Sequence, residues 1–160
     1  MSFFSTSHEK LIRKFVKHRV DFVLIGGHAA IFHGVRRTTS DIDILIQPTL
    51  KNGDRIITAF KDLGLDVSTI KSTDFLKEQV FSFGMEPHAV DILNFSKGVS
   101  VDDIFKNSIT RKLDGLQFRI IDIRDLIQNK KKLNRDTDKS LIDEYDVRAL
   151  TKILKSKKDN

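Results

Sequence analysis

The feature that most constrains this chain is a pair of aspartates inside an apolar run, LIGGHAAIFHGVRRTTSDIDILI at residues 24–46. Asp41 and Asp43 alternate there with Ile42 and Ile44. In a β-strand, residues two apart point to the same face, so this pattern predicts a strand that buries the isoleucines and presents both carboxylates together. Because two unpaired carboxylates repel each other and are costly to bury, we expect a cation between them.

The kind of cation follows from the available ligands. The chain has no cysteine, and no histidine pair lies near the aspartates, so oxygen ligation favours Mg²⁺ or Mn²⁺. Asp91 interrupts a second apolar run, HAVDILNF, and would complete a carboxylate cluster if the two strands were neighbours. Three carboxylates that hold two metal ions suit phosphoryl or nucleotidyl transfer. Two alternatives stay open: Asp41 and Asp43 on the surface of an edge strand, and Asp91 as a turn cap after Pro87.

A glycine pair precedes the aspartates. Gly26 and Gly27 end the strand-like run VDFVLIGG and come directly before a short helical segment that closes at Gly34. A backbone without side chains can approach a phosphate closely, and the first N–H groups of a helix can bind it. The spacing of this pair from the two acids predicts a phosphate site beside them.

The remaining pattern predicts an α/β (α+β) domain with a mixed sheet flanked by helices. A capping box at Thr6 and Glu9 predicts a helix to about residue 18. Asp114–Gly115 predicts a tight hairpin late in the chain. Further strands are predicted at 41–48, 65–70, 78–84 and 88–95, and helices at 53–64, 101–108 (capped by Ser100), 122–133 (capped by Asp122) and from about 139, with Ile142, Tyr145, Ala149 and Ile153 in register.

Length and composition favour one domain over residues 1–160, with a basic C-terminal helical segment at about 122–160. The net charge is +6, and most of the excess lies in residues 101–160, which is consistent with attraction of nucleotides or RNA, or with solvated helix faces. The absence of cysteine is compatible with the cytoplasm. The sequence shows neither a membrane-spanning run nor a signal peptide, so we expect no membrane partner.

The segment GGHAAIFHGVRRTTSDIDILI, with the later VDIL, resembles the nucleotidyltransferase (DNA polymerase β-like) superfamily. More narrowly, it is similar to small bacterial nucleotidyltransferase-like proteins, including toxins of the AbiEii type from toxin–antitoxin pairs. The resemblance is tightest over residues 22–46 and continues loosely along most of the chain. It implies a nucleotidyltransferase fold that binds a nucleoside triphosphate, usually with Mg²⁺, and moves a nucleotide onto a hydroxyl.

The resemblance also implies roles for particular residues. Gly26 and Gly27 would hold the triphosphate, and Arg37 and Thr39 match a run that is common before the paired acids, so these four would bind nucleotide. Asp41, Asp43 and Asp91 would be the catalytic, metal-binding carboxylates. For Arg36 and Arg37, solvation and phosphate binding stay open as alternatives. The later Lys130, Arg135 and Asp138 match a further pattern without fixed roles, and His28 stands where a small residue is usual.

The resulting expectation is a cytoplasmic nucleotidyltransferase (EC 2.7.7-type) that uses Mg²⁺ or Mn²⁺ and an NTP, with ATP as the expected donor. Its acceptor stays open among tRNA or other RNA, a partner protein and a small molecule. The first alternative is a catalytically inactive nucleotide-binding or toxin–antitoxin partner module of the same fold. A metal-dependent phosphohydrolase or nuclease would have similar carboxylates, but the glycine pair ahead of the acids disfavours it.

Overall fold

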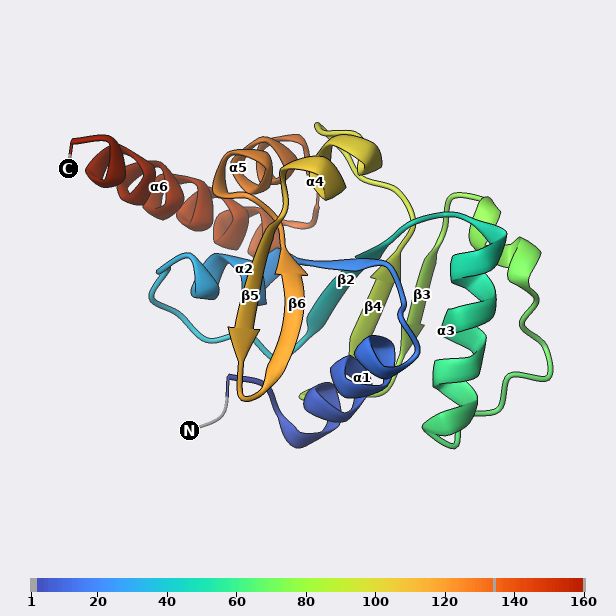
Figure 1. The fold of residues 1–160 in the computed structure, drawn as a ribbon. Helices are drawn as coiled ribbons and strands as arrows, with labels where there is room; N and C mark the ends of the chain where they lie inside the picture. Colours follow the sequence, from blue (N-terminus) through green and yellow to red (C-terminus); the bar gives the residue numbers. More distant parts are fainter. Residues whose placement is uncertain (1–2, 134, 160) are drawn as a thin grey trace.

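The structure is a computed structural model, and it describes residues 3–133 and 135–159. Among these residues a six-stranded sheet has the order β3-β4-β2-β1-β6-β5 (Figure 1). The strands are β1 (Phe22–Ile25), β2 (Ile42–Ile46), β3 (Val80–Phe83), β4 (Val90–Leu93), β5 (Ile109–Leu113) and β6 (Leu116–Ile120).

The sheet is mixed. β2 pairs with β4, and β1 with β6, in parallel, whereas β1–β2, β3–β4 and β5–β6 are antiparallel pairs. β1 and β2 therefore form the centre, and the order confirms the predicted mixed sheet. Because β2 and β4 run in the same direction, residues near their N-terminal ends lie at one edge of the sheet.

Helices lie on both sides of this sheet. Their bounds are α1 (Thr6–Lys17), α2 (Gly26–Phe32), α3 (Leu50–Asp62), α4 (Val101–Asn107), α5 (Ile123–Lys132) and α6 (Thr137–Asp159), with a 3₁₀ helix η1 at Ser72–Leu76. Helix α1 contacts α3, while α5 contacts both α6 and α2. Figure 1 shows α4, α5 and α6 gathered at one end of the sheet, away from α1 and α3. None of the helices in the described ranges is both long and apolar enough to cross a bilayer.

The central strands carry the core. All four residues of β1 are buried, and in β2 only Asp43 is not, so these strands are covered on both faces. Ile42 and Ile44 are fully buried, as the alternation around the aspartates predicted. Most phenylalanines also pack in the core; for example, Phe15 meets Phe22 and Phe60.

Several local predictions are confirmed. Asp114 and Gly115 both have positive φ and close the β5–β6 hairpin, as a type I′ turn requires. The side chains of Ser100 and Asp122 accept backbone N–H groups at the starts of α4 and α5. The first helix ends at Lys17, close to the predicted boundary, but Ser5 rather than Thr6 caps it by accepting the N–H of His8.

The strand predicted at residues 65–70 is wrong. This segment is irregular, and the side chain of Asp66 accepts the backbone N–H of Ser68 at 3.0 Å. Such a local side-chain bond offers the backbone an alternative to a sheet ladder. Alternation of Leu65, Val67 and Thr69 was therefore a misleading signal.

The buried face of α6 also differs from the prediction. Ile142 and Tyr145 are exposed, while Asp143, Asp146 and Leu150 are buried. The helix begins at Thr137, two residues earlier than predicted. Ala149 and Ile153 of the predicted set pack against the core, so the periodicity failed only in the first turns of α6, where the helix docks through the buried Asp143 and Asp146.

The burial of β2 gives a matched test of the core. Leu45→Ala should lower the free energy of unfolding by about 2–5 kcal/mol, because it removes a fully buried side chain and leaves a cavity. The same substitution at Leu141, which is 60% exposed, should change it by no more than about 0.5 kcal/mol. Urea unfolding followed by circular dichroism measures both, and equal losses would contradict the described packing.

Candidate functional site

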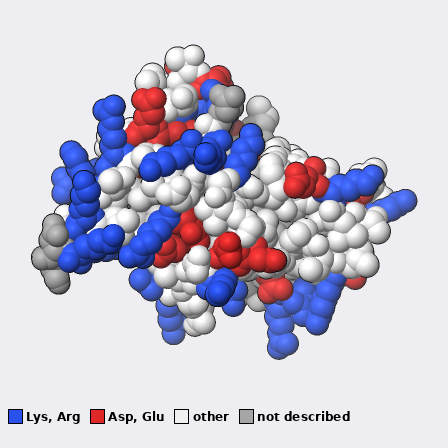
Figure 2. Space-filling view, turned by 90° about the horizontal axis from the view of Figure 1, so that it is seen from above, with Lys and Arg blue, Asp and Glu red and all other residues white. Residues whose placement is uncertain are grey.

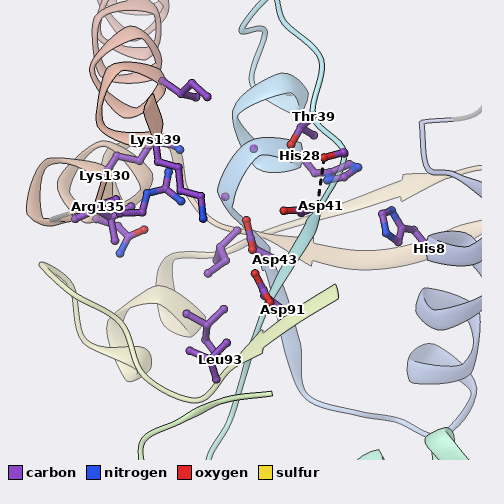
Figure 3. A pocket seen from close by; sticks show the side chains of 18 of the residues that line it. His8, His28, Thr39, Asp41, Asp43, Asp91, Leu93, Lys130, Arg135 and Lys139 are labelled. Atoms are coloured by element: carbon purple, nitrogen blue, oxygen red, sulfur yellow. Dashed lines mark hydrogen bonds between the residues drawn. The ribbon is translucent and has the colours of Figure 1, made fainter. Parts of the chain in front are cut away.

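Strand register brings the three predicted carboxylates to one edge of the sheet. Asp43 of β2 is the Cα partner of Asp91 of β4 in the parallel pair. On its other side Asp43 is opposite Ile25, the last residue of β1. Asp41 directly precedes β2, so it lies at the same edge, and Figure 3 shows the three side chains together.

Each carboxylate has a different local environment. The Ser82 hydroxyl, opposite Asp91 on β3, donates to Asp91 Oδ1 at 2.5 Å. The Ser40 hydroxyl donates to Asp41 Oδ1 at 3.2 Å. Among the described residues, none of the ion pairs involves Asp41, Asp43 or Asp91. The cluster therefore carries uncompensated negative charge at close range.

This crowding changes the acidity of Asp43. Burial raises its pKa from the ordinary 3.8 to about 6, and the charges of Asp91 and, to a smaller extent, Asp41 act in the same direction. Lys130 and Arg135 oppose the shift but do not cancel it. Removal of a proton from Asp43 is thus harder than for an exposed carboxyl group, and further positive charge at the site would ease it.

The positions of the carboxylates show how far they are arranged to bind a metal ion. In residues 3–133 and 135–159, no three Asp, Glu or His side chains stand close enough together to hold a metal ion as they are. The donor chemistry nevertheless fits a hard cation, because Asp43 and Asp91 are adjacent oxygen donors whose mutual repulsion a cation would relieve. Asp43 and Asp91 are the pair to which such an ion would bind.

Close contacts within the site explain why glycine occupies positions 26 and 27. Gly26 has a φ of 68°, and a Cβ there would overlap the Asp43 carboxylate. A Cβ on Gly27 would stand 2.7 Å from Thr39 Oγ1 and 2.9 Å from Arg37 Nη2. The glycines therefore allow these side chains to approach the start of α2, where the sequence predicted room for a phosphate.

Arg37 is already paired. Its Nε and Nη2 donate to Asp146 of α6 at 2.8 and 2.9 Å, and its Nη1 donates to the backbone oxygen of Thr38. Asp146 is fully buried and also accepts from Lys130 Nζ at 2.8 Å. Burial disfavours ionisation of Asp146, but the bonds from Arg37 and Lys130 outweigh it and hold its pKa below the ordinary value.

A second aspartate of α6 extends this network. Asp143 accepts from Arg135 and lies 3.4 Å from Lys130 Nζ. Asp138, which the sequence grouped with Lys130 and Arg135, is exposed at the start of α6, so Asp143 and Asp146 are the acids that pair with these cations. Their spacing of three residues on one helix face was the signal available in the sequence.

These elements surround a cavity of about 930 Å³. Its volume lies near the upper end for small-molecule sites. Figure 2, a view from above, shows acidic side chains near the middle and basic side chains crowded at the left, on the side where α6 lies in Figure 1. The cavity is lined by Ser5, His8, Ile25, Gly26, Gly27, His28, Arg37, Thr38, Thr39, Ser40, Asp41, Asp43, Val80, Glu86, Pro87, His88, Asp91, Leu93, Phe95, Ser96, Lys97, Asn129, Lys130, Leu133, Arg135, Lys139 and Ile142.

Two buried histidines belong to this lining. Burial lowers the pKa of His28 to about 4, and the nearby His8 and Arg37 contribute to the shift. Burial also lowers the pKa of His8, whose Nε2 lies 3.1 Å from the backbone oxygen of Ala89. Both rings are therefore neutral at pH 7. His28 Nδ1 has no hydrogen-bond partner in the described part of the chain. No sequence pattern marked His8 as part of this cavity.

Comparison with known proteins identifies the family to which the chain is similar. Residues 5–158 match the sequence profile of a family described as "Nucleotidyl transferase of unknown function (DUF2204)". Among curated proteins, none matches the chain significantly.

Two solved structures share the fold. An antigenic nucleotidyltransferase-like protein from Paracoccidioides brasiliensis has a TM-score of 0.56 and 14% identity, covering 92% of this chain and 77% of that one. The lincosamide antibiotic adenylyltransferase LnuA, in a lincomycin-bound structure, has a TM-score of 0.55 and 13% identity, covering 94% of this chain and 98% of that one. At these identities the likeness establishes the fold alone, which confirms the predicted nucleotidyltransferase fold.

The raised pKa of Asp43 predicts that this residue lowers the free energy of unfolding in a pH-dependent way. Between pH 4 and 6 the native state keeps a proton that the unfolded chain releases, so stability falls as pH rises through this window. Asp43→Asn should remove that fall and raise the free energy of unfolding above pH 6 by up to about 3 kcal/mol, with no gain below pH 4. Urea unfolding from pH 3.5 to 8 tests this. Asp102→Asn, on the exposed first turn of α4, should keep the wild-type profile, and a wild-type profile for Asp43→Asn would refute the shift.

The ion pairs of α6 predict a large loss when Asp146 is removed. Asp146→Ala leaves Arg37 and the buried Lys130 without their shared partner, which should cost about 3–5 kcal/mol of unfolding free energy. Glu144→Ala, at an exposed position of the same helix, should cost less than about 0.5 kcal/mol. Thermal and urea unfolding of the two variants provide the comparison, and similar values would show that the network does not dock α6.

Proposed function

The chain belongs to this nucleotidyltransferase family, and from that premise we propose that it is a Mg²⁺-dependent enzyme that transfers a nucleotide from an NTP to an acceptor hydroxyl. ATP is the proposed donor. The observation that carries the proposal is the in-register placement of Asp43 and Asp91 on adjacent parallel strands, with Asp41 beside them, at the wall of a large cavity. The raised pKa of Asp43 supports it, because it marks a site that lacks positive charge.

Each predicted residue receives a role in this proposal. Asp43 and Asp91 hold Mg²⁺, with Asp41 as the third acid. The backbone at Gly26 and Gly27, with Thr39, faces the nucleotide. Arg37 keeps α6 in place through its bidentate pair with Asp146, beside the nucleotide site. The cavity lysines and Arg135 supply the main attraction for the triphosphate, and helices α5 and α6 act with the sheet as one domain.

The reaction is an in-line displacement. The acceptor oxygen forms a bond to the α-phosphorus, the bond between that phosphorus and the bridging oxygen breaks, and pyrophosphate leaves with the electron pair. The hydroxyl proton passes to Asp91, whose carboxylate lies beside Asp43. Bound Mg²⁺ would supply positive charge for the phosphate oxygens. Position and charge provide most of the rate enhancement in such transfers.

One observation favours a second candidate. Because no three acidic or histidine side chains of the described ranges form a ready metal cluster, a nucleotide-binding partner module without turnover is the alternative. Both candidates bind nucleotide, so only turnover separates them.

The test is transfer of label from ATP in the presence of Mg²⁺. Purified protein is mixed with ATP labelled on the α-phosphate and with total RNA, small hydroxyl compounds or candidate proteins. Asp43→Asn and Asp91→Asn should each reduce transfer at least about a hundredfold, because each removes a carboxylate that the reaction needs. Binding of ATP by calorimetry, measured in parallel, separates lost turnover from lost binding.

Asp102→Asn serves as the control, because this exposed aspartate lies on α4 and outside the cavity lining. It should transfer label at the wild-type rate. Transfer that persists in Asp41→Ala/Asp43→Ala would sink the assignment of the carboxylates. Binding of ATP by the wild-type protein without transfer to any acceptor class would favour the inactive module.

A further inference from the structure

The cavity has two chemically different ends, one on each side of the carboxylates. Lys130, Arg135 and Lys139 lie on one side of Asp43, and His8 lies on the other (Figure 3). We call the first group, with Lys97, the basic end. We call Ser5, His8, His28, Glu86 and His88 the histidine end. The volume of about 930 Å³ is large enough for two ligands to lie side by side.

The chemistry of the transfer assigns the two ends. In an in-line displacement, the attacking and leaving oxygens lie on opposite sides of the α-phosphorus. The leaving pyrophosphate is strongly anionic, so it belongs at the basic end, where Lys97 and Lys139 form no ion pair within the described ranges, whereas Lys130 and Arg135 are paired with aspartates of α6. With the α-phosphorus at the carboxylates, the acceptor hydroxyl must approach from the histidine end.

The histidine end is built from several elements that meet near Asp41. His8 comes from the first turn of α1, and His88 from the turn between β3 and β4. The ring of His8 lies 5.7 Å from that of His28 and 6.4 Å from that of His88.

The charge of this end is negative. Glu86 and Asp41 line it, and within residues 3–133 and 135–159 neither forms an ion pair. Arg37 is the cation that reaches toward His28, and its charge is matched by Asp146. An acceptor that carries phosphates near its hydroxyl would meet repulsion here, whereas a cationic acceptor would be attracted.

His28 supplies an independent sign that this end awaits a ligand. The side chain is about 95% buried, yet Nδ1 has no partner among the described residues. A hydrogen bond with the backbone of Asp41 engages the ring, and Nδ1 is the ring nitrogen that is left without a partner. A buried polar atom without a partner is costly, and a hydroxyl group of a ligand would satisfy it.

We propose that the histidine end binds the acceptor, and that this acceptor is an amine-bearing hydroxyl compound rather than a nucleic acid. The inference rests on the proposed function, because it takes the carboxylates as the place of transfer. Glu86 and Asp41 attract the ammonium group, while His28 Nδ1 forms a hydrogen bond with a hydroxyl group of the acceptor. The basic side chains of the opposite end serve the triphosphate and do not serve as an RNA track.

The experiment follows histidine ring signals by NMR in the full-length protein, with Mg²⁺ and saturating α,β-methylene-ATP. The probes are glucosamine, glucose, glucose 6-phosphate and a ribotrinucleotide, of which the first three share one ring and differ in charge. Glucosamine should shift His8, His28 and His88 and bind at least about threefold more tightly than glucose. The two phosphate-bearing probes should shift none of the three. His18 and His33 lie outside the cavity lining and serve as internal controls.

A pair of charge-reversal variants checks the cause. Glu86→Lys should lower the affinity for glucosamine about fivefold. Glu78→Lys changes another exposed glutamate, outside the cavity lining, and should leave the affinity unchanged. Shifts of His8 and His88 by the trinucleotide, or the absence of such shifts with glucosamine, would overturn the inference. Failure of α,β-methylene-ATP to bind in calorimetry would instead overturn the proposed function, so the two failures are distinguishable.

Discussion

The repulsion between Asp43 and Asp91 is the constraint on which the site depends. The parallel register of β2 and β4 places these carboxylates side by side at the wall of the cavity. Burial and, after it, the charge of Asp91 raise the pKa of Asp43, which is the cost of that arrangement. Gly26 allows the carboxylate to lie against the start of α2, where any Cβ would displace it. A cation or a phosphate-bound metal would relieve the repulsion, so the same feature that weakens the fold prepares it for a ligand.

The C-terminal helix α6 holds several basic side chains on one side of this acidic cluster. Asp143 and Asp146 hold Lys130, Arg135 and Arg37 in a network of ion pairs that joins α5, α6 and the segment before β2. Buried pairs of this kind contribute little net stability but are costly to break. Their consequence here is positional, because they fix Lys130 and Arg135 on one side of the carboxylates, while Arg37, which reaches toward His28, is itself paired with Asp146. The basic end and the histidine end of the cavity therefore differ in charge.

Much of the architecture could be predicted from local pattern. The hairpin turn and the helix caps depend on bonds within a few residues, so the sequence signals Asp114–Gly115, Ser100 and Asp122 directly. The alternation of a strand likewise signals the burial of Ile42 and Ile44. Predictions failed where longer-range contacts decide. Residues 65–70 alternate like a strand but have no partner strand, and Ile142 and Tyr145 of α6 look like core but are exposed.

The sequence by itself determined that Asp41 and Asp43 share a site, because the period of a strand leaves little choice, and it pointed to Gly26 and Gly27 as their neighbours. Only the tertiary structure decided that Asp91 joins them, since the pairing of β2 with β4 depends on the order of strands across the sheet. It also decided that Arg37 faces Asp146, more than a hundred residues away, and that His8 lines the same cavity. Such contacts arise from the packing of separate elements, and no local pattern encodes them.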